Sequence, residues 1–335
     1  MRFAVGRRER FAARRPDGRR WVLSAVALAV GWGLIPMPQL AVGQPPQEKA
    51  GKHVVFLAGG PSHGFGSHEH RAGCLLLAKK LGEVLPEVTT AVYSPWPTES
   101  SALDRADAVV VFADGGGGNL IQRRLAELQP ILDRPVGLVV LHYALDLPDP
   151  AAREKMKQWI GGYYETFWSV NPHWRAEFRE LPDHPVTRGV RPFSIDDEWY
   201  YHMRFVDETR GLTPILTAVP PDATRKGPDG PHSGNPAVRA RLGMPEHVAW
   251  AYERPGGGRG FGFTGGHWHW NWAHDDYRTL VLNAVAWAAG IEVPTEGLRT
   301  SAPTVDELLE NLDEPIPDSF DRETLKRRIQ AWRQP

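Results

Sequence analysis

Histidines follow the short apolar run at residues 53–59. The loop behind this run contains His63, His68 and His70, with Glu69 between the last two. A neutral imidazole is a common ligand of transition metals and the usual acid or base near neutral pH, and carboxylates often complete such sites. Three histidines in such a short loop favour metal binding or proton transfer. An ordinary exposed polar loop would also contain these residue types.

His142 ends a second apolar run, GLVVLHY. In doubly wound α/β proteins, a residue at a sharp strand-to-helix turn is held toward the ligand pocket, where hydrolases place a nucleophile. Histidine occupies this place here, with no serine or cysteine, so acyl-enzyme chemistry is disfavoured. Acid/base work or metal ligation is favoured, and Tyr143 is expected to shape the pocket. The alternative is a hydrogen-bonded histidine in the core.

Glu198 lies in a group of carboxylates and aromatic residues, DDEWYYH. A carboxylate beside apolar rings can have a raised pKa and act as a general base. Strand alternation would place Glu198 on the opposite side from Asp197 and Trp199. A solvated turn is the competing interpretation for Asp196 and Asp197.

The sequence HWHWNW begins at His267. Extended backbone would place His267 and His269 on one face, available to an ion, and Trp268 and Trp270 on the other, available for packing or for a sugar ring. Arg278 follows and is a candidate substrate ligand. The alternative is that the tryptophans cap the core and the histidines bond to the backbone.

The order of apolar and amphipathic segments predicts a parallel sheet with helices on both faces. Strands are expected within 53–59, 88–94, 106–118 and 135–145, and helices over 71–85, 119–132 and 151–164. In such sheets, ligands bind beyond the carboxyl ends of the strands, where several of these histidines lie.

The second half of the chain is less regular. A Pro/Gly-rich excursion over 220–248 precedes two segments, 247–254 and 258–265, that resemble paired strands around a turn. A helix is expected over 275–290. The C-terminal tail, 292–335, has two charged helical patterns and is expected to pack on the outside or to fray.

Residues 1–43 have the form of a secretory signal: arginine pairs, an apolar stretch, and AVG before Gln44. We therefore expect an exported, periplasmic or extracellular protein without stable membrane insertion after cleavage, and the paired arginines fit twin-arginine export loosely. An uncleaved anchor is the rival interpretation. Residues 44–52 are interpreted as a linker and 53–291 as the main domain.

Composition excludes several classes of function. The formal net charge of −1 gives no indication of nucleic-acid binding. Cys74 is the single cysteine, which excludes an intramolecular disulfide and a cysteine-based metal cage. The glycines at 115–118 are not followed by a nucleotide-binding motif.

Together the motifs resemble the ThuA-like (trehalose utilisation) family. The matching segments are VVFLAGGPSHGFGSHEH, GLVVLHY, HPVTRGV, FSIDDEWYYH and GFTGGHWHWNW, and they span about residues 53–291. The resemblance implies a flavodoxin-like fold shared with class I glutamine amidotransferases. It does not imply glutamine hydrolysis, because His142 stands at the nucleophile position. It also implies a role in sugar catabolism beside a sugar oxidoreductase that makes 3-keto sugars, and a divalent metal, zinc in some members.

The resemblance directs attention to His63, His142, Glu198 and His267. We assign His142, Glu198 and His267 to catalysis, His63, His142 and His267 to metal binding, and Tyr143, Trp268, Trp270 and Arg278 to the sugar pocket. The expected activity is metal-assisted acid/base cleavage, by a lyase or a hydrolase, or isomerisation of a sugar or 3-keto-glycoside. A ketone at C3 acidifies the C2 proton, which a histidine or glutamate would remove. The alternatives are a non-catalytic sugar-binding or scaffold domain and, more remotely, a peptidase- or amidase-like hydrolase.

Overall fold

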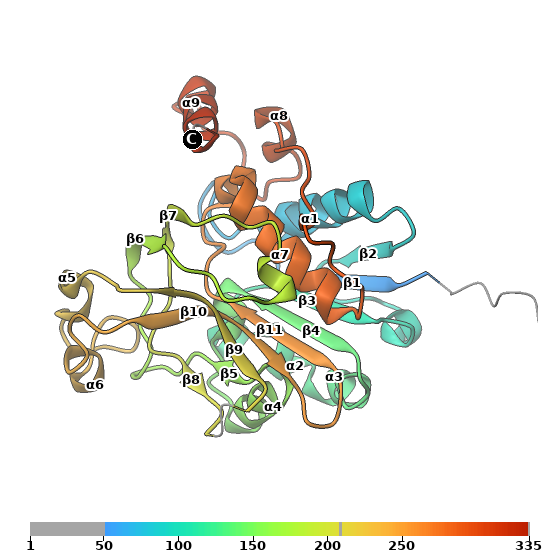
Figure 1. Cartoon of the computed structure of the whole chain (residues 1–335), viewed down its shortest axis with the longest axis horizontal. Coiled ribbons are helices and arrows are strands. Elements are labelled where there is room, and N and C mark those ends of the chain that lie inside the picture. The colour runs from blue at the N-terminus through green and yellow to red at the C-terminus, as the bar shows by residue number, and fades with distance from the viewer. Residues whose placement is uncertain (1–50, 208–209, 334–335) are drawn as a thin grey trace, which may run out of the picture. The chain divides into compact units, whose positions relative to one another are not determined.

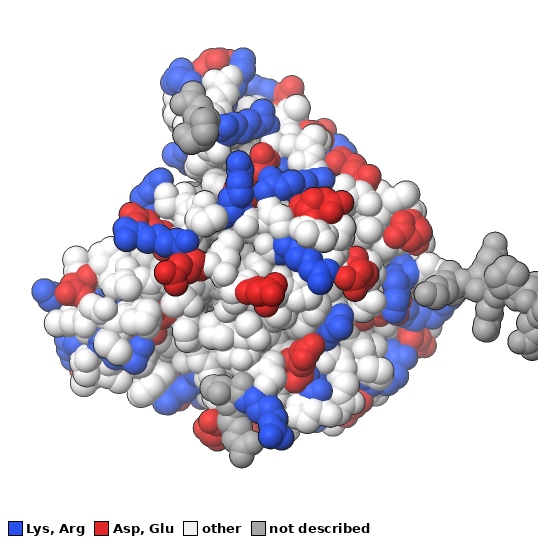
Figure 2. All heavy atoms as spheres, viewed as in Figure 1, with Lys and Arg blue, Asp and Glu red and all other residues white. Residues whose placement is uncertain are grey.

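The computed structural model describes residues 51–207 and 210–333 (Figure 1). The predicted signal sequence, residues 1–43, lies outside the described residues. Within the described ranges, no helix is both long and apolar enough to cross a membrane. Basic and acidic side chains are interspersed over the face shown in Figure 2, in keeping with the net charge of −1.

A seven-stranded sheet forms the centre of the described chain, in the order β2-β1-β3-β4-β11-β10-β9. Its strands are β1 (His53–Ala58), β2 (Thr89–Tyr93), β3 (Ala108–Phe112), β4 (Gly137–Leu141), β9 (Leu212–Ala218), β10 (Glu246–Glu253) and β11 (Arg259–Phe263). The first four strands and β11 are parallel, and β10 pairs antiparallel with both of its neighbours. The predicted pairing of 247–254 with 258–265 is therefore confirmed.

Helices cover both faces of the sheet, as the sequence predicts (Figure 1). Alternate residues of β1 enter two separate apolar clusters: Val54 and Phe56 face one side, and Val55 and Leu57 the other. The first cluster includes residues of α1 (His70–Val84) and α7 (Asp275–Ala288); the second includes residues of α2 (Leu120–Arg123), α3 (Leu125–Leu132) and α4 (Pro150–Ile160). The strand order β2-β1-β3-β4 followed by β11 is flavodoxin-like, so the predicted doubly wound α/β fold is confirmed.

Two predicted helices differ in their limits. The expected helix 119–132 is interrupted at Arg124, whose φ of −118° separates α2 from α3. The expected helix 151–164 ends at Ile160, because Gly161 adopts a left-handed conformation (φ 78°) and caps it. The sequence-based limit ran past this glycine into β5.

The segment between α4 and β10 adds two short sheets beside the main one. β5 (Gly162–Tyr163) pairs with β8 (Arg204–Phe205), and β6 (His173–Phe178) forms an antiparallel ladder with β7 (Phe193–Glu198). The Pro/Gly-rich excursion contains α5 (Asp222–Arg225) and α6 (Pro236–Arg239). Short 3-10 turns are η1 (Ser100–Leu103), η2 (Gly116–Gly118), η3 (His142–Leu145), η4 (Pro185–Thr187) and η5 (His269–Ala273).

The C-terminal tail packs against the domain through α8 (Val305–Leu308) and α9 (Arg322–Trp332). Leu308, Leu325 and Ile329 are buried in the apolar cluster that contains α1 and α7. Phe320 stacks on Trp270, with ring centroids 5.6 Å apart. The tail is therefore an outer layer of the fold rather than a frayed end.

His274 links α7 to acid stability. Its Nδ1 accepts a hydrogen bond from the Tyr277 backbone N–H at 3.4 Å, which caps the helix, and burial lowers its pKa from 6.5 to about 4 despite the nearby carboxylates of Asp276 and Asp275. Since this folded-state pKa is below the unfolded one, the unfolded chain binds more protons between pH 6.5 and about 4. Stability is therefore lost as the pH falls through this window.

His274→Asn keeps a capping oxygen but does not titrate. When the pH falls from 7 to 4.5, the wild type should lose about 2–3 kcal/mol more of its unfolding free energy than this variant. Urea denaturation at both pH values measures this. Gln330→Asn, an exposed substitution in α9 that involves no titratable group, is the control and should keep the wild-type pH slope. An unchanged slope in His274→Asn would contradict the assignment.

Candidate metal centre

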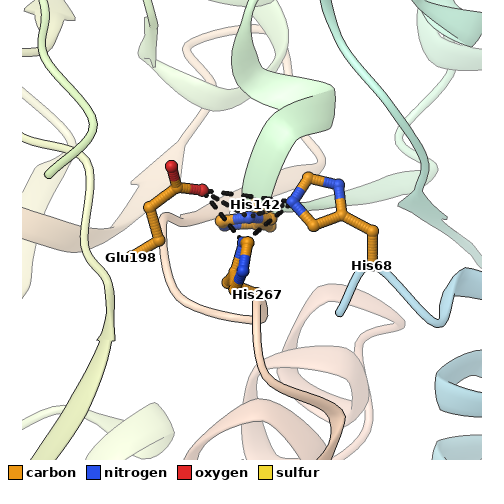
Figure 3. Close-up of side chains that lie close together, drawn as sticks. All are labelled: His68, His142, Glu198 and His267. Carbon is orange, nitrogen blue, oxygen red and sulfur yellow. Dashed lines mark hydrogen bonds and ion pairs between the residues drawn. The ribbon is translucent and has the colours of Figure 1, made fainter. Parts of the chain in front are cut away.

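Four side chains from distant parts of the chain converge at the carboxyl edge of the central sheet (Figure 3). His68 comes from the loop after β1, His142 from the turn after β4, His267 from the loop after β11, and Glu198 from the end of β7. One ligand atom of each lies within 4.8 Å of the ligand atoms of the others. This is the place where open α/β sheets bind ligands.

Two of the histidines have unusual backbone conformations. His68 (φ 52°) and His142 (φ 55°) both adopt the left-handed region, which is strained for residues other than glycine. Such strain persists only where the surrounding structure imposes it, and it concentrates at functional sites. His142 thus stands at the sharp turn that the sequence predicts.

The loops that carry His68 and His267 are joined by backbone hydrogen bonds. The His68 N–H donates to the carbonyl oxygen of His267 at 3.0 Å, and the His269 N–H donates to that of Gly66 at 2.9 Å. These two bonds hold two segments that are about 200 residues apart in the sequence in a fixed register.

The outer nitrogens of two rings are fixed as donors. His142 Nδ1 lies 2.8 Å from the carbonyl oxygen of Thr264, which can only accept, and His68 Nδ1 lies 2.9 Å from a carboxylate oxygen of Asp114. Metal-binding histidines typically have such partners, which set the tautomer of the ring. In the neutral rings, both Nε2 atoms are then unprotonated.

These two unprotonated Nε2 atoms lie 3.1 Å apart. Two nitrogen lone pairs at this distance repel each other unless a proton or a cation lies between them. His267 Nδ1 is a third nitrogen, 3.0 Å from His68 Nε2. The arrangement therefore fits a cation held by three imidazoles.

The carboxylate of Glu198 completes the group. Its Oε2 lies 3.1 Å from His267 Nδ1, 3.4 Å from His142 Nε2 and 4.0 Å from His68 Nε2. Burial opposes ionisation, but the three histidine side chains around the carboxylate together lower the pKa of Glu198 well below its usual range. Three neutral nitrogens and one anionic oxygen suit zinc and other first-row divalent ions, whereas magnesium and calcium prefer oxygen ligands alone.

The same balance of burial and bonding acts on the histidines and on Asp114. Burial lowers the pKa of His142. Burial acts in the same direction on His68, but the carboxylates of Asp114 and Glu198 together outweigh it and raise the pKa of His68. Burial opposes ionisation of Asp114, but His68, Ser62 and His70 together outweigh it and lower the pKa of Asp114 to about 2. Asp114 is therefore an anion that orients His68.

Asp197, on the opposite face of β7 from Glu198, fixes the loop of His267. Its carboxylate accepts hydrogen bonds from the backbone N–H groups of Gly266 (2.9 Å) and His267 (3.1 Å). It also accepts the Tyr277 hydroxyl at 2.7 Å, and the residue is 1% exposed. The predicted alternation of Asp197 and Glu198 is confirmed. The solvated-turn interpretation is wrong for both aspartates, because Asp197 is buried and Asp196, although exposed, lies within β7.

Further polar side chains surround the four. The Tyr200 hydroxyl lies 3.2 Å from His142 Nε2 and 3.3 Å from Glu198 Oε2. The ring of His63 stacks on His68 with centroids 3.6 Å apart, and its side chain is 39% exposed. His63 belongs to a second group, with His68 and Asp114, rather than to the group of four.

The predicted pocket residues differ in how far the structure buries them and in what they contact. Tyr143 is half-buried behind His142, with its ring 5.9 Å from that of His68. Trp268 is half-buried, packed on His267 and on His173 at 4.6 and 5.7 Å between ring centroids. Trp270 is buried between Phe65 and Phe320.

Arg278 is fully buried, and its guanidinium donates to Asp275, to the Trp272 carbonyl and to Thr300. These bonds join α7 to the start of the tail, which indicates a structural role.

The expected alternation along HWHWNW is wrong beyond Trp268. The backbone turns into η5, so His269 does not share a face with His267 and is buried, with a pKa lowered by burial to about 4. Gly66 explains the turn, because its carbonyl holds the His269 N–H. No local feature of the sequence reveals this long-range bond.

The sequence indicates both His63 and His68 in the first histidine cluster and favours His63 as the ligand, whereas the structure places His68 in the group of four. Asp114, Asp197 and Thr264 were not assigned as supports, although Asp114 follows β3 at the same sheet edge and that position was the available signal. Thr264 acts through its backbone carbonyl, which the residue type does not reveal.

Comparisons with known proteins place the chain in a family. The sequence pattern of the ThuA family, described as trehalose utilisation, matches residues 59–288, and the chain belongs to this family. The four converging residues all lie within the matched range. Membership supports a carbohydrate-related role.

Solved structures also resemble the chain. One is a ThuA-like protein from Bacteroides uniformis, with 16% identity over 74% of this chain and 94% of that chain, and a TM-score of 0.48. Another is a ThuA-like protein from Parabacteroides merdae, with 15% identity over 76% and 98% and a TM-score of 0.43. No functionally curated protein matches the chain.

The role of Asp197 gives a stability prediction. In Asp197→Asn, the amide N–H₂ group would face backbone N–H groups that now donate hydrogen bonds to the carboxylate, so donor would meet donor. We expect a loss of about 3 kcal/mol in the free energy of unfolding, because a buried, charge-assisted set of bonds is broken. Urea denaturation measures this loss. Asp196→Asn, next along the strand and exposed, should change it by less than about 0.5 kcal/mol. Equal effects in both variants would refute this role.

Proposed function

We propose that the chain is a divalent-metal-dependent enzyme that acts on a carbohydrate bearing a carbonyl group, with a 3-keto-glycoside as the substrate class. The observation that carries the proposal is the convergence of His68, His142, His267 and Glu198. The carbohydrate part draws support from the family match.

The residues present fit a divalent ion. The Nε2 atoms of His68 and His142, the Nδ1 of His267 and a carboxylate oxygen of Glu198 would hold it, and the partners of the first two rings already leave those Nε2 lone pairs free. When bound, the ion supplies a Lewis acid that polarises a carbonyl oxygen and stabilises the negative charge developing there.

The proton-transfer role falls to residues outside this group, because a lone pair that binds a metal cannot also accept a proton. His63 is the strongest candidate. It stacks on His68 at the exposed side of the site, and Ser62 Oγ lies 2.8 Å from its Nδ1. His173 is the other exposed histidine here, with its ring 4.7 Å from that of His267.

A 3-keto-glycoside would be cleaved by elimination across its C1–C2 bond. The base takes the proton from C2, the C–H electron pair forms a double bond to C1, and the C1–oxygen bond breaks with its electrons on the leaving oxygen. A general acid then protonates that oxygen. The Tyr200 hydroxyl, buried beside Glu198, is placed to donate a hydrogen bond within the site.

Metal content tests the proposal directly. Protein that lacks residues 1–43, purified without a histidine tag, should contain close to one equivalent of a first-row divalent ion by elemental analysis. His68→Ala and His267→Ala should each lose it. Asp114→Asn should retain it with about 10- to 100-fold weaker affinity, because the outer partner of a ligand is removed. Asp133→Asn, which changes an exposed aspartate directly after α3, is the control.

Absence of metal from the wild type after dialysis against zinc, manganese and iron(II) would overturn the metal assignment. His142 and Glu198 would then be free to serve as an organic acid/base pair, as the sequence alone suggests.

The role of His63 separates catalysis from simple binding. His63→Ala should keep its metal and fold but lose about 10²- to 10⁴-fold in kcat on a 3-keto-glucoside, the range for one general acid or base. His173→Ala is the variant matched to His63→Ala, because it removes the other exposed histidine beside the site. A non-catalytic sugar-binding domain would instead bind the sugar without turnover in the wild type and in both variants.

A further inference from the structure

A cavity of about 510 Å³ lies beside the candidate metal centre. Three separate parts of the chain line it: the β6–β7 hairpin, the stretch at the start of η5, and helix α9 of the tail. The lining residues are Arg175, Asp196, Trp268, Trp270, Asn271, Arg328 and Trp332. Its volume is within the roughly 300–1,000 Å³ of small-molecule sites.

We propose that this cavity is a subsite for a second pyranose ring, so that the substrate is a disaccharide or longer glycoside whose remote sugar lies under α9. This inference rests on the proposed function, because it places the reacting sugar at the group of four. It adds the size of the substrate and the elements that recognise it.

The hairpin connects the cavity to the metal centre along one face. His173 pairs with Glu198, and Arg175 pairs with Asp196, two residues further along each strand. Side chains two residues apart point to the same face and are about 7 Å apart, from a rise of about 3.4 Å per residue. Glu198 is in the metal centre and Asp196 lines the cavity, so a ligand can extend from one to the other over a distance comparable to one sugar ring.

Trp268 forms the second connection. Its ring packs on His267, which belongs to the metal centre, and the same residue lines the cavity. A glycoside bound with its reacting carbon at His267 would therefore pass Trp268 before it reaches Trp332 on α9.

The chemistry of the lining suits an uncharged sugar. Indole rings offer flat apolar faces to the C–H side of a pyranose, and Trp268 and Trp332 are both only partly buried. Arg175 and Asp196, paired at 2.8 Å, offer a donor and an acceptor of the kind that hydroxyl groups need. Arg175 and Asp196 neutralise each other, and Arg328 adds one further donor for hydroxyl groups.

The wall from the tail is held in place before any ligand binds. Leu325 and Ile329 of α9 are buried against the domain, and the Trp332 ring packs on His274 at 5.5 Å between centroids. Both residues that α9 contributes to the cavity, Arg328 and Trp332, lie beyond the matched range 59–288. The tail thereby acquires a function in substrate recognition.

Binding measurements test the subsite independently of catalysis. Isothermal titration calorimetry of the chain without residues 1–43 should give an affinity for trehalose at least about tenfold higher than for methyl α-glucoside, because stacking of one extra ring contributes about this much. Trp332→Ala and Arg328→Ala should reduce this ratio to about two or less. Arg327→Ala, which removes an exposed arginine of α9 that does not line the cavity, should keep the wild-type ratio.

His68→Ala distinguishes this inference from the proposed function. It should lose metal and activity but keep the preference for the disaccharide, because the second ring binds elsewhere. Arg328→Ala guards against damage to the tail, since Arg328 is exposed and is not part of the apolar packing. Equal affinities for the two sugars in the wild type, or an unchanged preference in both Trp332→Ala and Arg328→Ala with unchanged melting temperatures, would overturn the subsite.

Discussion

The approach of two histidine nitrogens, His68 Nε2 and His142 Nε2 at 3.1 Å, is the contact on which the rest of the site depends. Thr264 and Asp114 fix the outer nitrogen of each ring as a donor, so the inner nitrogens face each other as lone pairs. A buried arrangement of this kind costs free energy unless a cation or a proton compensates it. The fold therefore maintains an approach of three imidazoles that the isolated loops would not keep.

The scaffold achieves this with a rigid edge and strained turns. The parallel strands end at the same edge of the sheet, and the left-handed residues His68 and His142 direct their side chains into the site at that edge. Asp197 then fixes the loop of His267 through backbone N–H groups rather than through the histidine ring. Backbone anchoring leaves the ring free for ligation, which explains how a buried carboxylate one residue from Glu198 has a purely supporting role.

The C-terminal tail connects this centre to the outer surface. It covers Trp270 through Phe320 and brings Trp332 and Arg328 beside the β6–β7 hairpin. The histidines and tryptophans of HWHWNW are consequently divided among three environments: His267 in the candidate metal centre, Trp268 at its rim, and His269 and Trp270 beneath the tail.

The sequence by itself determined the α/β fold, because the alternation of apolar runs with amphipathic helices has few packing solutions. It placed His142 and His267 at strand ends and indicated Glu198 as a candidate acid or base. It predicted the opposite faces of Asp197 and Glu198, since alternation is a local property of a strand. It indicated His63 as the ligand, whereas the structure brings His68, five residues further along the same loop, into the group of four. That choice depends on the left-handed turn at His68 and on backbone bonds to residues about 200 positions away, and only the tertiary structure brings these partners together.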